Sequence, residues 1–192
     1  MTTTDRGPAA RSADDVVVTI GGAEDVDTLL VLLDDAVRWM TRVGHTGQWG
    51  TRPFSTDPGG VAQATRWATE DTLFLAWLGD RPVGALAIGA PPPFVPPATE
   101  PELYLAIQVV DHAHKGRNIS GVMMEHAERL ARRRGATALR GDCYAGEGGA
   151  VVRHYVSLGF EVVGDFTVDT RSGPWPGQIV RLPVDPVGPV DA

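Results

Sequence analysis

The feature that most constrains the fold of this chain is the junction of three segments: ELYLAIQVV (102–110), DHAHKGRNIS (111–120) and GVMMEHAERLARRRGA (121–136). The first segment is apolar and partly β-branched, which predicts a strand. The last has apolar residues at helical spacing, which predicts an amphipathic helix from about Ile119 to Arg134. A basic loop therefore opens a long helix, where free backbone N–H groups and the helix dipole both favour an anion.

The spacing of apolar residues predicts which face of this helix is buried. They lie at i, i+3, i+4, i+7, i+8 and i+11 and share one face: Ile119, Val122, Met123, His126, Ala127 and Leu130. Asn118 is predicted as the N-cap, and the basic run 132–134 suits the negative end of the helix dipole. Lys115 and Arg117 add positive charge to the loop, and Gly116 lets a ligand approach its backbone. The loop is therefore a candidate phosphate site, the alternative being a connection that binds nothing.

The rest of the chain predicts further strands and helices in alternation. The expected strands are 16–20, 72–78, 83–89, 137–144, 160–168 and 177–184. The expected helices are one that ends at Gly44, a short one over 60–69 and one over 149–159. Residues 90–101 are rich in proline, which cannot donate to a sheet ladder, so they are expected to form a loop. This order predicts an α/β or mixed α+β sheet of about seven strands with helices on both faces.

Length, charge and cysteine content restrict the class of protein. The 192 residues suit one domain, expected over 16–184, with tails at 1–15 and 185–192. A net charge of −7 argues against nucleic acid or an anionic membrane as the main partner. Cys143 is the only cysteine and cannot form an intramolecular disulfide, which fits a reducing compartment. The first residues do not resemble a signal peptide, and no run approaches the ~20 apolar residues of a membrane span, so a cytoplasmic location is predicted.

Two motifs resemble those of the GNAT-type N-acetyltransferase superfamily. In LAIQVVDHAHKGRNISGVMMEHA, the family pattern Gln/Arg-x-x-Gly-x-Gly/Ala falls on residues 115–120, at the start of the helix. RHYVSLGF (153–160) resembles the second hallmark, an aromatic residue shortly before Gly-Phe. Lys115, Asn118 and Ser120 depart from the usual residues of the first motif. Asparagine tolerates a left-handed backbone and serine is small, so the loop is expected to keep its conformation.

The resemblance implies a GNAT-like acyl-CoA N-acyltransferase fold with acetyl-CoA between the splayed parallel strands 102–110 and 137–144. Backbone N–H groups of the loop would hold the pyrophosphate: Lys115, Gly116, Arg117, Asn118, Ile119 and Ser120. Val109 and Val110 would offer backbone groups to the pantetheine arm, and one of them would stabilise the oxyanion.

The resemblance also implies catalytic roles. Tyr155 occupies the position of the family's general acid, and a phenol with a pKa near 10 is protonated at neutral pH. Glu102 occupies a strand start where many members place a carboxylate base, the alternative being an ordinary solvated glutamate. Asp142 and Tyr144 are further polar candidates near the cleft, although Asp142 also suits a turn. Cys143 lacks an adjacent base that would lower its pKa.

The acceptor is expected to contact the segment between the first two helices. Trp49 and Phe54 are its candidate walls, Gln48 a candidate polar contact, and loop 90–101 another wall. Trp49 as a core residue is the alternative. Asp142 completes the predicted substrate-binding set, and the acidic composition suits a cationic amine.

These features predict an acetyl-CoA-dependent N-acetyltransferase that acts on an amine of a small molecule or peptide by direct attack, with a tyrosine general acid. The alternative is a non-catalytic acyl-CoA-binding regulator or sensor. The expected partners are acetyl-CoA and the amine, without nucleic acid or membrane, and a homodimer is a further option. His112 and His114 form an HxH pair without a nearby third ligand, so no metal is expected.

Overall fold

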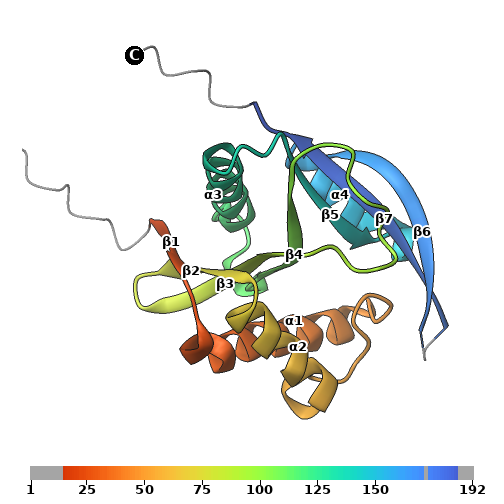
Figure 1. The fold of residues 1–192 in the computed structure, drawn as a ribbon. Helices are drawn as coiled ribbons and strands as arrows, with labels where there is room; N and C mark the ends of the chain where they lie inside the picture. Colours follow the sequence, from red (N-terminus) through yellow and green to blue (C-terminus); the bar gives the residue numbers. More distant parts are fainter. Residues whose placement is uncertain (1–14, 171–172, 186–192) are drawn as a thin grey trace, which may run out of the picture.

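The computed structural model describes residues 15–170 and 173–185, which form a seven-stranded mixed sheet (Figure 1). Its strands are β1 (Val16–Ile20), β2 (Thr72–Leu78), β3 (Arg81–Gly89), β4 (Glu102–Val110), β5 (Ala138–Tyr144), β6 (Glu161–Thr170) and β7 (Gly173–Pro183). Their order in the sheet is β1-β2-β3-β4-β5-β7-β6. The pair β4 and β5 is parallel, and the other neighbouring pairs are antiparallel. The predicted fold class and strand count are confirmed.

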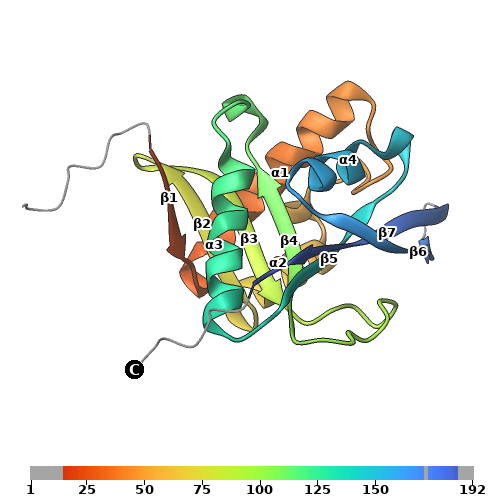
Figure 2. The ribbon, with the colours of Figure 1, turned by 90° about the horizontal axis from the view of Figure 1, so that it is seen from above.

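Four α-helices cover the two faces of the sheet (Figure 2). They are α1 (Val26–Val43), α2 (Pro58–Thr69), α3 (Ile119–Arg133) and α4 (Ala150–Ser157). Helices α1 and α2 pack on one core, and α3 and α4 contribute to the core on the other face. Alternating residues of β2 divide between these cores: Leu73 and Leu75 belong to the first, and Phe74 to the second. This double burial explains why β2 is an unbroken apolar run.

The boundaries of α1 and α2 follow from their caps. Helix α1 ends before Gly44, whose φ of 81° places it in the left-handed region, as expected for a C-terminal glycine. Helix α2 begins two residues before the predicted start at residue 60. The cause is Asp57, whose carboxylate accepts a hydrogen bond from the Gly60 N–H at 3.0 Å, with Pro58 in the first turn.

Helix α3 confirms the prediction from apolar spacing. Four residues of the predicted face are fully buried: Ile119, Met123, Ala127 and Leu130. Val122 and His126 lie at the edge of this face and are half-buried, whereas Met124 and Ala131 are also buried. The His126 ring packs against Phe74, with 4.6 Å between ring centroids, which fits its place on the predicted buried face.

Residues 1–14 and 186–192 lie outside the described residues, so the predicted terminal tails stay a prediction. Within the described ranges, no helix has both the length and the apolar character needed to cross a membrane.

Candidate active site

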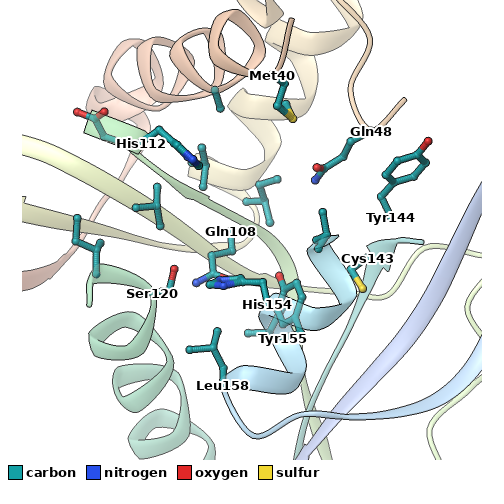
Figure 3. A pocket seen from close by; sticks show the side chains of 18 of the residues that line it. Met40, Gln48, Gln108, His112, Ser120, Cys143, Tyr144, His154, Tyr155 and Leu158 are labelled. Carbon is teal, nitrogen blue, oxygen red and sulfur yellow. The ribbon is translucent and has the colours of Figure 1, made fainter. Parts of the chain in front are cut away.

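The site begins where the two parallel strands separate. Residues Glu102–Leu105 of β4 pair with residues 138–141 of β5, and the pairing stops there. Beyond this point β4 continues beside β3 to Val110, and β5 continues beside β7 to Tyr144. A cleft of about 730 Å³ opens along the separated ends (Figure 3). The splayed strands inferred from the family resemblance are therefore present.

The backbone of β4 turns only some of its polar groups toward this cleft. The Asp111 N–H donates to the Val83 carbonyl of β3 at 2.8 Å. In an antiparallel pair, alternate residues direct both polar groups to the same neighbour, so Val109 also faces β3. Gln108 and Val110 face the cleft instead. Of the two valines expected to offer backbone groups to a ligand, Val110 therefore turns its polar groups to the cleft, whereas those of Val109 pair with β3.

The loop before α3 has the left-handed backbone that its sequence suggested. Gly116 has a φ of 91° and Asn118 a φ of 52° with a ψ of 30°. The expectation that Asn118 tolerates this conformation is confirmed. Its side chain makes no capping hydrogen bond, although its carbonyl accepts one from the Val122 N–H at 3.0 Å. Asn118 therefore begins the helix through its backbone.

The amides of the loop are not equivalent. Those of Lys115 and Arg117 donate to the carbonyls of His112 and His114, at 3.3 and 3.2 Å. Those of Ile119 and Ser120 lie in the first turn of α3, where N–H groups have no acceptor within the helix. Every residue from 115 to 120 except Arg117 lines the cleft. The first turn of α3 thus supplies the N–H groups of this segment that have no acceptor within the helix and line the cleft.

The two histidines of the loop have partners within the protein. The His112 ring stacks on Trp39, with 3.3 Å between centroids. His114 Nδ1 lies 3.0 Å from Asp111 Oδ2, and this carboxylate also contacts Arg81. The pKa of Asp111 is lowered overall. Burial alone would raise it, but hydrogen bonds from Ala113 and His114 to the carboxylate outweigh the effect of burial. No group of three or more potential metal-ligating side chains occurs among the residues the structure describes.

Tyr155 is one of the residues that line the cleft. It comes from α4, is 9% exposed, and packs edge-on against Phe160 with 5.3 Å between centroids. Burial, with smaller contributions from Cys143 and Asp142, raises the pKa of the phenol, so it is protonated at neutral pH. Cys143 is 4% exposed, and burial raises the pKa of its thiol to about 12. Cys143 is therefore a poor nucleophile at neutral pH.

Gln108 is a cleft residue that the sequence interpretation missed. Its Nε2 atom is buried and has no hydrogen-bond partner, and Figure 3 places its side chain among Ser120, His154 and Tyr155. A buried unsatisfied donor costs about 1–3 kcal/mol, which favours a ligand acceptor at this point. The available signal was a lone polar side chain in the strand ELYLAIQVV.

The end of the cleft opposite the first turn of α3 contains most of the predicted acceptor residues. Gln48, Trp49 and Asp142 line it, together with Tyr144 and the unpredicted Trp175. In Figure 3, Gln48 and Tyr144 lie on one side of Tyr155, and Ser120 lies on the other.

Two predicted acceptor walls do not line the cleft. Phe54 supports Trp49 from behind, edge-on, with 5.6 Å between centroids. No described residue of loop 90–101 lines the cleft, because the loop packs elsewhere. Its Phe94 stacks on Phe166 at 5.0 Å, and its Val95 is buried beside Tyr104.

The comparison with known families agrees with this geometry. The sequence profile of the Acetyltransferase (GNAT) family matches residues 34–160. The chain belongs to this GNAT family. None of the curated protein sequences matches it.

Solved GNAT structures share the fold of this chain. A GCN5-related N-acetyltransferase from Rhodopseudomonas palustris has a TM-score of 0.67 and 15% identity, over 92% of this chain and 99% of that chain. The acetyltransferase structure described as yncA from Salmonella typhimurium, with its cofactor acetyl-CoA, has a TM-score of 0.60 and 18% identity, over 92% and 98%. The ribosomal-protein-S18-alanine N-acetyltransferase from Escherichia coli has a TM-score of 0.61 and 16% identity, over 93% and 99%.

One implied catalytic residue does not fit this GNAT site. Glu102 lines a second cavity, of about 390 Å³, and does not line the cleft. Its Oε2 lies 2.9 Å from Arg140 Nε in a mostly buried ion pair. The cleft opens only beyond Leu105, at the opposite end of β4, so Glu102 is not brought together with Tyr155. The implied role of Glu102 as general base is therefore not supported by its position.

Proposed function

We propose that this GNAT protein is an N-acetyltransferase that uses acetyl-CoA and an amine of a small molecule or peptide, by direct attack. The observation that carries the proposal is the buried Tyr155 phenol in a cleft that has a helix N-terminus at one end and a polar aromatic wall at the other. A single cleft thus offers an anion site, a proton donor and an acceptor site.

The residues of the cleft suit acetyl-CoA. The free N–H groups of Ile119 and Ser120 would hold the pyrophosphate at the positive end of α3, beside Lys115. Gly116 has open space where a side chain would be, which leaves its backbone accessible. Gln108 supplies a buried donor that lacks a partner, and Val110 supplies a backbone amide. When bound, acetyl-CoA supplies an activated acetyl thioester.

Transfer requires a C–N bond to form, the C–S bond to break and one proton to move from nitrogen to sulfur. Tyr155 keeps its proton at neutral pH and would donate it to the departing sulfur. An N–H of β4 that faces the cleft, such as that of Val110, would stabilise negative charge on the acetyl oxygen. Cys143 remains a thiol, which supports direct attack by the amine over transfer through a cysteine. An acceptor that arrives as ammonium also releases one proton to water.

The substitution Tyr155→Phe tests this assignment. Loss of a general acid lowers turnover by about 10²–10⁴-fold, while affinity for acetyl-CoA changes little. Turnover is followed by release of free CoA thiol across an amine panel, and binding by calorimetry. Val156→Ala, at an exposed position of the same helix, is the control and should behave as wild type. An unchanged rate in Tyr155→Phe would remove this residue from the mechanism.

Two observations favour the alternative of a non-catalytic acyl-CoA sensor. The candidate base Glu102 lies in a different cavity, and the Asp142 carboxylate already accepts a hydrogen bond from Tyr104. Acetyl-CoA binding without thiol release over a broad amine panel would support the sensor. Absence of binding would contradict both functions.

A further inference from the structure

The acceptor end of the cleft is built largely from aromatic rings. Trp49, Tyr144 and Trp175 line it. The Tyr144 and Trp175 rings lie 5.4 Å apart at 41°, and Phe54 supports Trp49 from behind. The Trp175 indole N–H donates to the Gln48 carbonyl at 3.0 Å, which fixes its orientation. Flat apolar surfaces held this way favour a flat apolar ligand.

The acceptor end of the cleft contains one acidic side chain, Asp142, and no lysine or arginine among the described residues that line it. Asp142 lines the cleft close to Tyr155, the proposed general acid, and helps to raise the pKa of its phenol. Burial raises the pKa of Asp142 itself, its hydrogen-bond donor is the neutral Tyr104 phenol, and no side chain among the described residues forms an ion pair with it. Burial thus disfavours the ionised carboxylate in the free protein, and a ligand ammonium beside Asp142 would favour that ionised form.

No arginine or lysine balances this carboxylate within the cleft. Of the described residues that line it, Lys115 is the one such cation, and it belongs to the loop before α3. Asp111, the second lining carboxylate, already contacts Arg81 and His114. A carboxylate on the acceptor would therefore meet Asp142 without a compensating charge.

The segment after α1 borders this end of the cleft and is fixed there by contacts with other elements. The Gly47 N–H donates to the Glu147 carboxylate at 2.8 Å, and the Gln48 carbonyl accepts from Trp175. Gly47 packs so closely on Tyr144 that a Cβ atom there would collide with the phenol. These contacts join the α1–α2 connection to β5, β7 and the segment before α4, which favours a compact acceptor over a polypeptide.

We propose that the acceptor is a compact primary amine with an aromatic body and no carboxylate, of the arylalkylamine class. This inference rests on the transferase function proposed above. The ring lies among Trp49, Tyr144 and Trp175, and Asp142 attracts the amine toward Tyr155. The corresponding amino acid would be excluded, because its α-carboxylate would be repelled by the Asp142 carboxylate. Specificity would then come from an unfavourable contact with the wrong acceptor.

Matched acceptor pairs test the inference on the wild-type protein. Tyramine against tyrosine, and tryptamine against tryptophan, differ only by the carboxylate. We expect kcat/KM to be about a hundredfold higher for each amine than for its amino acid, measured by release of CoA thiol. Spermidine and a short peptide with an N-terminal alanine should be poor acceptors. Binding of tyramine to the CoA-saturated protein is measured separately by calorimetry.

The substitution Asp142→Asn removes the charge but keeps an oxygen that accepts from Tyr104. We expect the KM for tyramine to rise by about tenfold or more, with the KM for acetyl-CoA unchanged and the preference for tyramine over tyrosine largely lost. Asp165→Asn, at an exposed position of β6, is the matched control and should behave as wild type. A retained preference in Asp142→Asn would overturn the role of this carboxylate.

The outcomes separate the inference from the function on which it rests. Equal use of tyrosine or the peptide would overturn the acceptor class and leave the transferase intact. Tyramine binding that tyrosine does not share, without any thiol release, would support the amine site and overturn the transferase. Absence of both tyramine binding and tyramine acetylation would overturn the inference.

Discussion

The left-handed backbone of Asn118 leads to a quantitative prediction about the loop 115–120, which we propose to hold the pyrophosphate. With a φ of 52° this residue occupies a region that costs an ordinary L-residue about 1–2 kcal/mol, and a β-branched residue suits it worst. Asn118→Val therefore adds strain of this size to the conformation that presents the first-turn amides of α3. If the free loop relaxes, the strain appears as acetyl-CoA binding weakened by about 5–30-fold. If it does not relax, the strain appears as a lower free energy of unfolding.

Two measurements capture both cases. Calorimetry gives the affinity for acetyl-CoA, and urea unfolding gives the stability of the free protein, and the two losses together should amount to about 1–2 kcal/mol. Asn118→Gly is the matched control, because glycine adopts this φ readily but lacks the side chain. We expect its affinity to equal or exceed that of wild type. The reasoning is refuted if the valine variant matches wild type in both measurements, or if the glycine variant binds as weakly as the valine variant.

Three further experiments test other parts of the structure. Gly47→Ala places a methyl group against Tyr144, so the KM for the amine should rise while acetyl-CoA affinity measured by calorimetry stays constant, and an unaltered amine KM would contradict this packing. Cys143 should resist iodoacetamide at pH 8 and react once unfolded in urea, since burial raises its pKa to about 12; rapid labelling of the native protein would contradict its burial. Hydrogen bonds, chiefly from Arg181, lower the pKa of Glu100 from 4.5 to about 2, which stabilises the fold above pH 4.5 and is lost toward pH 2. Glu100→Gln should therefore be less stable than wild type at pH 7 in urea unfolding, with a gap that narrows over that pH range, and a constant gap would argue against this linkage.

The fold was largely predictable because its signals are local. Strand β4 and helix α3 lie within a residue of their predicted positions, since an apolar run and a 3.6-residue period are readable in short windows. Helix α2 and strand β7 were less accurate. The start of α2 depends on a cap by Asp57 that precedes the apolar pattern, and β7 begins at Gly173, four residues before its predicted start at 177.

The candidate site was predictable only in part. The loop 115–120 could be found because one continuous segment contains both its charges and its helix start. Gln108 and Trp175 were missed, the first because one polar residue in a strand is a weak signal. Trp175 reaches the site through a contact with Gln48, which is 127 positions away in the chain. No local pattern reports such a contact.

The sequence by itself determined the elements, their order and the family, because these follow from residue periodicity and from motifs within short segments. The tertiary structure decided where β4 and β5 separate, and hence that Glu102 lies at a different cavity while Asp142 and Tyr155 share the cleft. It also decided which residues of β4 turn their amides to that cleft. Strand pairing sets both outcomes, and pairing depends on residues far apart in the chain.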